Sequence, residues 1–338
     1  MKIDEKMKHR AEWLYERKWG VMVHYLADLP SCLDPVDLSP EEWNRRVDKF
    51  DVKNFVKQLS EIKCGWLIFS IGQNSGFYCS PNETYDEIVK RKPSRLSKRD
   101  LIKDLGEELG EKDIRLITYL PSQAPLNDIY ALEKLKCTPI WKGPKWGLRD
   151  DQYKVQEGVD ERLTDFQIYW ESIIREWSKR WGKLVSGWWF DGCYYSDKMY
   201  NFPDEPNFKS FAESARSGNL DSIVAFNPGV KVPIISLTEY EDYTAGEIAG
   251  ALPVNGIEPC VIPLGRFIKN AQYHILTFIG GCWARGSPRF TDEFLISYTK
   301  HINSFGGAIT YDFPPPSEDG NIPLSFFNQL KKLSLQIN

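Results

Sequence analysis

Short apolar segments alternate with amphipathic stretches along most of the chain. Residues 20–26 (GVMVHYL) and 65–71 (GWLIFSI) are apolar runs that predict strands. Between them, residues 51–62 (DVKNFVKQLSEI) place their apolar side chains on one face of a helix, with Asp51 as the expected N-cap. An alternation of strands and amphipathic helices predicts βα units and a parallel sheet.

The same pattern continues to the C-terminus and gives about eight strands. Further strands are predicted at 114–120, 187–190, 222–226, 234–237, 274–279 and 307–311, and 274–279 could also be helical. Further helices are predicted at 98–109, 163–181, 208–215, 291–305 and 323–335. Residues 136–158 predict a long loop, and 251–267 has no clear assignment. Eight parallel strands would form either a closed barrel or an open doubly wound sheet, and periodicity alone leaves both open.

Composition narrows the class of protein. The 338 residues, 42% of them hydrophobic, suit one α/β barrel, which typically needs about 250 residues. A net charge of −4 without a basic stripe argues against a nucleic-acid partner. The charged N-terminus and the lack of long apolar runs predict neither a signal peptide nor a membrane span. Seven scattered Cys and four scattered His favour a cytoplasmic protein with reduced thiols and no metal site.

Two acidic segments are the main candidates for chemistry. Asp191 directly follows the apolar segment WWF, at the strand end where parallel folds place reactive groups, although a turn or cap role is an equal alternative. Glu239, Glu241 and Glu247 belong to an acidic cluster farther along, most of which we expect to be solvated. One carboxylate beside Asp191 would complete the pair that glycoside hydrolysis requires. The 12 Trp residues weakly favour a carbohydrate ligand.

Polar side chains also end other predicted strands. His24 and Tyr119 lie near the ends of the first and third strands, and Gln73 and Asn74 follow the second. Amide groups suit hydrogen bonding to sugar hydroxyls, but Asn-Ser-Gly is also ordinary turn chemistry, and a strand His is often a core residue. Phosphate-binding loops, dinucleotide fingerprints, zinc-protease helices and nucleophile elbows are absent from the sequence, so no cofactor is expected.

Several of these segments, taken in order, resemble glycoside hydrolase family 29, the α-L-fucosidases. The resemblance runs from about Trp13 to Leu335 and rests on six segments: 13–25 (WLYERKWGVMVHY), 50–78, 97–122, 187–192 (GWWFDG), 241–247 (EDYTAGE) and 305–323 (FGGAITYDFPPPSEDGNIP). It implies a (β/α)8 TIM-like barrel and a retaining mechanism without a metal. In that mechanism Asp191 is the nucleophile and Glu247 the acid/base, while Glu239 and Glu241 stay alternatives for the acid. His24, Tyr119, Trp189 and Trp283 carry over as sugar-pocket residues.

The chain also departs from the family pattern. Gln73-Asn74-Ser75-Gly76-Phe77 stands where the family has His-His-Asp-Gly-Phe, and Pro228 stands near the place of a family Arg. We therefore expect a retaining exo-glycosidase for a terminal α-L-fucose or a related sugar. The alternative is a catalytically inactive sugar-binding protein on the same barrel. We expect residues 1–338 to form one catalytic domain without a C-terminal β-sandwich, with a small glycoside as its ligand and possible homo-oligomers.

Overall fold

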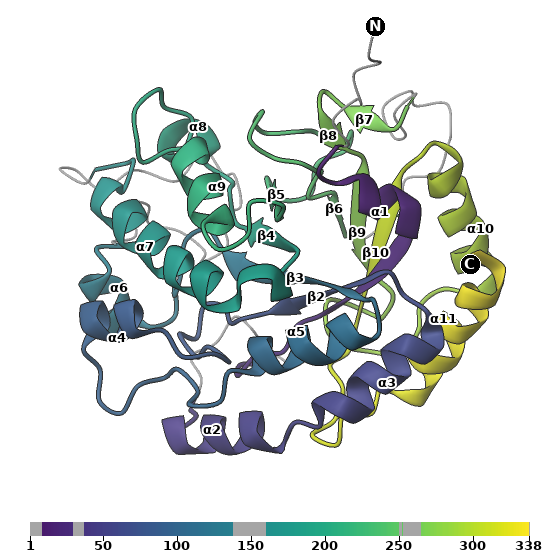
Figure 1. The fold of residues 1–338 in the computed structure, drawn as a ribbon, viewed down its shortest axis with the longest axis horizontal. Helices are drawn as coiled ribbons and strands as arrows, with labels where there is room; N and C mark the ends of the chain where they lie inside the picture. Colours follow the sequence, from purple (N-terminus) through teal and green to yellow (C-terminus); the bar gives the residue numbers. More distant parts are fainter. Residues whose placement is uncertain (1–8, 30–36, 138–159, 250–251, 253–264, 338) are drawn as a thin grey trace, which may run out of the picture.

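The predicted (β/α)8 TIM-like barrel is confirmed. A computed structural model of the chain describes residues 9–29, 37–137, 160–249, 252 and 265–337. Eight strands form one curled sheet in the order β5-β4-β3-β2-β1-β10-β9-β6, and all its pairs are parallel. The strands lie at the centre of Figure 1 with helices around them. They are β1 (Trp19–Val23), β2 (Trp66–Ser70), β3 (Arg115–Pro121), β4 (Gly187–Asp191), β5 (Ile223–Phe226), β6 (Glu247–Ile248), β9 (His274–Phe278) and β10 (Ala308–Phe313).

Helices lie between most consecutive strands and cover the outside of the sheet. Asp51 caps α3 as predicted, because its side chain accepts the Asn54 N–H at 2.9 Å. A small antiparallel pair, β7 (Phe267–Ile268) and β8 (Ala271–Gln272), lies outside the barrel. The helices are α1 (Glu12–Arg17), α2 (Pro40–Lys49), α3 (Val52–Ile62), α4 (Glu83–Val89), α5 (Leu101–Glu111), α6 (Ile129–Lys134), α7 (Thr164–Trp181), the 3-10 turn η1 (Gly182–Leu184), α8 (Ser196–Met199), α9 (Phe208–Arg216), α10 (Asp292–Ser304) and α11 (Leu324–Ile337).

The core has two parts. A large cluster fills the space between the sheet and its helices, with side chains such as Phe69, Trp170 and Trp188. A smaller cluster that includes Met22, Trp66 and Trp189 comes largely from the strands. Both clusters include several aromatic side chains, each of which removes a large apolar area from water.

One predicted strand is wrong. Residues 234–237 form no strand, and the sixth strand of the barrel is β6, ten residues farther along. The reason is local: the Glu241 carboxylate accepts the Leu237 N–H at 2.7 Å, which a strand would give to its neighbour. The ambiguous segment 274–279 is a strand, β9. The predicted loop at 136–158 lies outside the described residues from position 138 onward. Most of the segment 251–267 also lies outside them.

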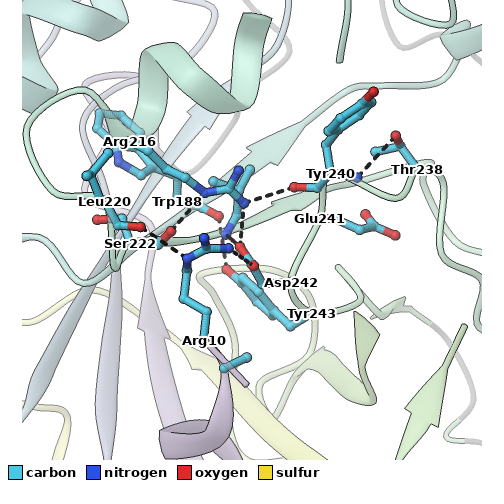
Figure 2. A network of polar contacts seen from close by, with 12 residues as sticks. Arg10, Trp188, Arg216, Leu220, Ser222, Thr238, Tyr240, Glu241, Asp242 and Tyr243 are labelled. Carbon is cyan, nitrogen blue, oxygen red and sulfur yellow. Dashed lines mark hydrogen bonds and ion pairs between the residues drawn. The ribbon is translucent and has the colours of Figure 1, made fainter. Parts of the chain in front are cut away.

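A polar network lies where the sheet passes from β5 to the sixth strand position. The Asp242 N–H donates to Val224 O at 2.8 Å, and the Asp242 carboxylate accepts the Val224 N–H at 2.9 Å. Figure 2 shows the guanidinium groups of Arg10 and Arg216 converging on the same carboxylate, at 2.5 and 2.6 Å. These contacts connect the segment before β6 to β5, although the two strands share no ladder.

The described part of the chain contains no helix that is both long and apolar enough to span a membrane.

Candidate active site

Two carboxylates from different strands share one hydrogen-bond donor. Asp191 is the last residue of β4, and Glu247 is the first residue of β6. The Asn227 side-chain amide donates to Asp191 Oδ1 at 2.8 Å and to Glu247 Oε2 at 2.7 Å. These two oxygens are therefore at most 5.5 Å apart. The strand ends thus bring together two carboxylates that lie more than fifty residues apart in the sequence.

Glycines allow the backbone turns beside both carboxylates. Gly192 has φ +80°, and its N–H donates to Asp191 Oδ1 at 2.8 Å. Gly246 precedes Glu247 with φ +67°, and a Cβ atom there would lie 1.9 Å from His274 O. Only glycine allows the chain to pass so close to β9 immediately before Glu247.

Tyr119 and Gln73 form a hydrogen-bond chain that ends on Asp191. The Tyr119 hydroxyl donates to Asp191 Oδ2 at 2.6 Å, and Gln73 Nε2 donates to the Tyr119 hydroxyl oxygen at 2.5 Å. Gln73 Oε1 is buried and has no partner. Trp189 stacks on the Tyr119 ring with their centroids 5.5 Å apart, and its indole N–H donates to Ala245 O at 3.1 Å. Because Gln73 Oε1 has no partner, it can accept a hydrogen bond from a ligand hydroxyl.

His24 lies beside these groups and pairs with a buried carboxylate. Its Nδ1 is 2.7 Å from Asp312 Oδ1, and its ring makes edge contacts with Tyr119 and Trp283. Burial alone would lower the pKa of His24, but the charges of Asp312, Asp191 and Glu247 together raise it above 6.5. The other oxygen of Asp312 accepts the Ala284 N–H at 2.7 Å. Asp312 thus holds both His24 and the turn that carries Trp283.

Glu247 has the electrostatic surroundings of a general acid. Burial and then the negative charge of Asp191 raise the pKa of Glu247 to about 7, against a smaller lowering by the Asn227 amide and His24. A carboxyl group with this pKa carries its proton in about half of the molecules at pH 7 and in most of them at lower pH. It can donate that proton to a departing oxygen and accept one back afterwards.

The other predicted residues lie in different surroundings. Asn74 is buried, but its side chain and backbone carbonyls accept the N–H groups of Leu126 and Asn127, so it holds a loop in place. Glu239 is exposed. Glu241 bonds backbone N–H groups at Leu237 and Phe226, and Figure 2 shows it pointing away from Asp242. Of the three glutamates, the structure brings only Glu247 to the Asn227 amide.

Sequence reasoning missed three residues of this arrangement. Asn227 follows β5 directly, so the strand-end rule that selected Asp191 also applied to it. Tyr194 comes soon after the same strand as Asp191, and the carboxylate charge of Asp191, then burial, raises its pKa. Asp312 lies inside β10, where a strand-end rule gives no signal. Within the described ranges, no group of three or more His, Cys, Asp or Glu side chains could hold a metal ion.

Comparisons with known proteins give structural likeness only. No family model and no curated protein sequence matches the chain. The endo-fucoidan hydrolase MfFcnA4 of glycoside hydrolase family 107 is similar with a TM-score of 0.67 and 18% identity, over 96% of this chain, which spans about half (53%) of that protein. The α-L-fucosidase AlfC from Lactobacillus casei is similar with a TM-score of 0.62 and 16% identity, over 96% of this chain and 97% of that protein. The endo-fucoidan hydrolase P5AFcnA has a TM-score of 0.65 and 15% identity, over 97% and 93%. These neighbours of the fold are fucose-acting glycoside hydrolases.

Proposed function

We propose that the protein is a retaining exo-glycoside hydrolase that removes a terminal α-L-fucose or a related sugar. Its nucleophile is Asp191 and its acid/base is Glu247. The observation that carries the proposal is the Asn227 amide, which bonds both carboxylates and limits their nearest oxygens to 5.5 Å. Retaining enzymes place their two carboxyl groups about 5–5.5 Å apart, whereas inverting enzymes leave about 6.5–9.5 Å for a water molecule.

The proposed reaction has two steps. Asp191 attacks the anomeric carbon while Glu247 gives its proton to the glycosidic oxygen, so the bond to the leaving group breaks and a glycosyl ester forms. The Glu247 carboxylate then takes a proton from water, whose oxygen attacks the same carbon and breaks the ester. Asp191 is released as a carboxylate, Glu247 regains its proton, and the sugar leaves with its original anomeric configuration.

Three groups beside Asp191 support a sugar ligand. The unpartnered Gln73 Oε1 can accept one hydroxyl, and His24 carries a raised pKa that favours a charged donor. Trp283 is half-buried and lies against His24, where its ring can cover an apolar face of a sugar. The choice of fucose follows the family 29 resemblance and the fucose-acting neighbours of the fold.

Hydrolysis of 4-nitrophenyl α-L-fucoside tests the roles of both carboxylates. We expect Asp191→Ala to lower kcat by at least about a thousandfold, since it removes the nucleophile. On this substrate Glu247→Gln should slow only the deglycosylation step, because that step requires a general base. The loss of activity at that step should be comparable to the loss in Asp191→Ala. Glu239→Gln is the matched control, because it neutralises an exposed carboxylate of the same acidic cluster.

The stereochemistry of the product tests the mechanism. Proton NMR of the first-formed sugar should show the α anomer. A β anomer would refute the retaining mechanism, and equal rates for wild type and Asp191→Ala would remove Asp191 as the nucleophile. Release of internal fragments from fucoidan without cleavage of the aryl fucoside would replace the exo assignment by an endo one.

A sugar-binding protein without catalysis is the second candidate. It is favoured by Gln73 and Asn74, which stand where the family 29 pattern has two histidines. Calorimetry that detects binding of fucose, together with no turnover of any tested glycoside, would support this alternative. Turnover that depends on Asp191 would exclude it.

A further inference from the structure

The hydrogen bonds around the Asn227 amide fix its orientation. Its Nδ2 donates to Asp191 Oδ1 and to Glu247 Oε2, and its Oδ1 accepts the backbone N–H of Gly229 at 3.1 Å. A flip of the amide would set Oδ1 against the Asp191 carboxylate and the Nδ2 protons against the Gly229 N–H. Both contacts would bring like groups together, whatever the charge of Glu247. The Gly229 N–H therefore favours the orientation in which Asn227 is a donor to both carboxylates.

The backbone of Asn227 is held by the end of β4. The Asn227 N–H donates to Phe190 O at 2.7 Å, and the Cys193 N–H donates to Asn227 O at 2.8 Å. Asn227 is also fully buried, so water does not compete for its amide. Because the backbone is fixed, the amide can change its partners only by rotation about the side-chain bonds, and the bond from Gly229 opposes that rotation.

Position 229 requires glycine for two reasons. Its φ is +78°, in the left-handed region that side chains other than glycine rarely adopt. A Cβ atom there would also lie 2.9 Å from Tyr194 Cε1 and 3.1 Å from Tyr194 Cδ1, so the ring packs directly over the Gly229 backbone. Any side chain at 229 would displace this turn and with it the N–H that Asn227 Oδ1 accepts.

The orientation of the amide determines which oxygen of Glu247 carries the proton. Glu247 Oε2 accepts the Asn227 N–H at 2.7 Å. In a protonated carboxyl group the carbonyl oxygen is the better acceptor, so this bond favours Oε2 as the carbonyl and Oε1 as the hydroxyl. With the amide flipped, Oδ1 would instead accept a proton from Oε2 and hold it away from a leaving oxygen.

We propose that Gly229 is a positioning residue for the acid step: through the Asn227 amide, its N–H keeps the proton of Glu247 on Oε1, the oxygen that Asn227 does not bind. This inference rests on the proposed function, because it takes Glu247 as the acid. The ring of Tyr194 supports the same turn from the segment that follows the nucleophile. The turns after β4 and β5 thus act together on the acid/base.

Two substrates that differ in their need for the acid test this role. Gly229→Ala should lower kcat/KM for methyl α-L-fucoside about tenfold more than kcat/KM for 4-nitrophenyl α-L-fucoside, because methanol needs the proton of Glu247 to leave and nitrophenolate does not. In an Asn227→Ala background, Gly229→Ala should leave the ratio of the two values unchanged. Equal losses on both substrates, or a change of ratio that persists without the amide, would overturn the proposal.

Gly182→Ala is the matched control for backbone strain. Gly182 has φ +51° and precedes β4 at the end opposite Asp191, and a Cβ atom there would lie 3.7 Å from Gly218 O, an ordinary contact. The control should therefore change kcat/KM for both substrates by the same factor. A change of ratio in Gly182→Ala as large as that in Gly229→Ala would show that strain alone causes the effect.

Neutron diffraction of wild-type crystals tests the proposal without a variant and without turnover. At about pH 5.5, below the pKa of Glu247 of about 7, the deuteron of Glu247 should lie on Oε1. The two deuterons of Asn227 Nδ2 should point at Asp191 Oδ1 and Glu247 Oε2. A deuteron on Oε2, or an amide oxygen facing either carboxylate, would refute the proposal. If no fucoside is hydrolysed, the proposed function fails, while the neutron result still decides the orientation of the amide.

Discussion

At the scale of single residues, Asn227 moderates the raised pKa of Glu247. Its amide N–H bonds Glu247 Oε2, which favours the ionised form and so opposes the rise in pKa caused by burial and by Asp191. The proposed acid must be protonated when glycosidic cleavage begins. We therefore expect kcat/KM of the wild type to fall about tenfold per pH unit above pH 7, as Glu247 loses its proton.

Removal of the Asn227 amide should move the alkaline limb of the pH profile, the part in which kcat/KM falls as Glu247 loses its proton. Asn227→Ala takes away a donor to the charged form, so the pKa of Glu247 rises and the limb shifts to higher pH. We also expect a lower kcat, because Asp191 loses the same donor. pH profiles of kcat and of kcat/KM on an alkyl fucoside, whose leaving group needs a proton from Glu247, measure both effects. A limb that stays in place while kcat falls would mean that Asn227 positions the carboxylates without setting their charge.

The pKa values of the two buried histidines, His24 and His274, should be shifted in opposite directions. Asp312 and the site carboxylates raise the pKa of His24 despite burial, whereas burial lowers the pKa of His274 to about 4. His274 has neutral partners: its Nδ1 lies 3.0 Å from Thr244 O and its Nε2 2.7 Å from Thr310 Oγ1. NMR of the four imidazoles should show His24 still mostly charged at pH 6.5 and His274 neutral at pH 5.

Asp312→Asn should affect only one of these signals. The substitution removes a negative charge 2.7 Å from His24, so the pKa of His24 falls, while the signal of His274 keeps its titration. Aryl fucoside hydrolysis should show a raised KM if charged His24 holds the sugar. An unchanged His24 titration in Asp312→Asn would show that Asp191 and Glu247 alone keep it charged.

At the scale of elements, Asp242 replaces a missing strand ladder between β5 and β6. The Arg216 side chain is 14% exposed and also donates to Ser222 O and Tyr240 O, whereas that of Arg10 is 39% exposed. We expect Arg216→Ala to lower the free energy of unfolding by about 2–3 kcal/mol, because it removes the more buried of the two guanidinium partners of the Asp242 carboxylate. Arg10→Ala should cost less than about 1 kcal/mol. Urea denaturation measures both, and equal costs would contradict the burial argument.

The same region explains which elements the sequence could predict. Apolar runs such as 65–71 have buried sides toward both helices and barrel interior, so hydrophobicity alone identifies β2. Hydrophobicity does not identify the sixth strand, because only Glu247 and Ile248 pair with a neighbouring strand. The residues before them are mostly polar or small. Residues 234–237 look like a strand locally, but the carboxylate of Glu241 accepts the Leu237 N–H, which a strand would give to its neighbour.

The residues of the candidate site could likewise be predicted from the sequence only in part. Asp191 and Tyr119 follow apolar strands, so the strand-end rule identified them without knowledge of any contact. Glu247 needed the family resemblance, because three glutamates in one cluster compete and local sequence cannot tell which one meets Asn227. Asp312 could not be found in this way, since it is defined by a contact to His24 across 288 residues.

At the scale of the whole molecule, folding buries several titratable groups and shifts their pKa values. Burial raises the pKa of Glu171 to about 7 and that of Glu241 to about 8, while it lowers the pKa of His274 to about 4. Glutamates with raised values favour the folded state at low pH, and His274 favours it at higher pH. We therefore expect the stability maximum on the mildly acidic side of neutrality, at about pH 5–6.

Glu171 allows this expectation to be tested with one substitution. It lies between α7 and α9, where its Oε1 accepts the Ser210 hydroxyl at 2.7 Å, and glutamine can accept the same bond. The folded pKa of about 7 exceeds the unfolded value of 4.5, so unfolding releases a proton between these values. The stability that Glu171 contributes is complete below pH 4.5, falls as the pH rises toward 7 and is then lost. Glu171→Gln should therefore gain about 2 kcal/mol over the wild type at pH 8 relative to pH 4.5, measured by urea denaturation at both values. Parallel pH dependences of the two proteins would show that Glu171 is ionised in the folded state.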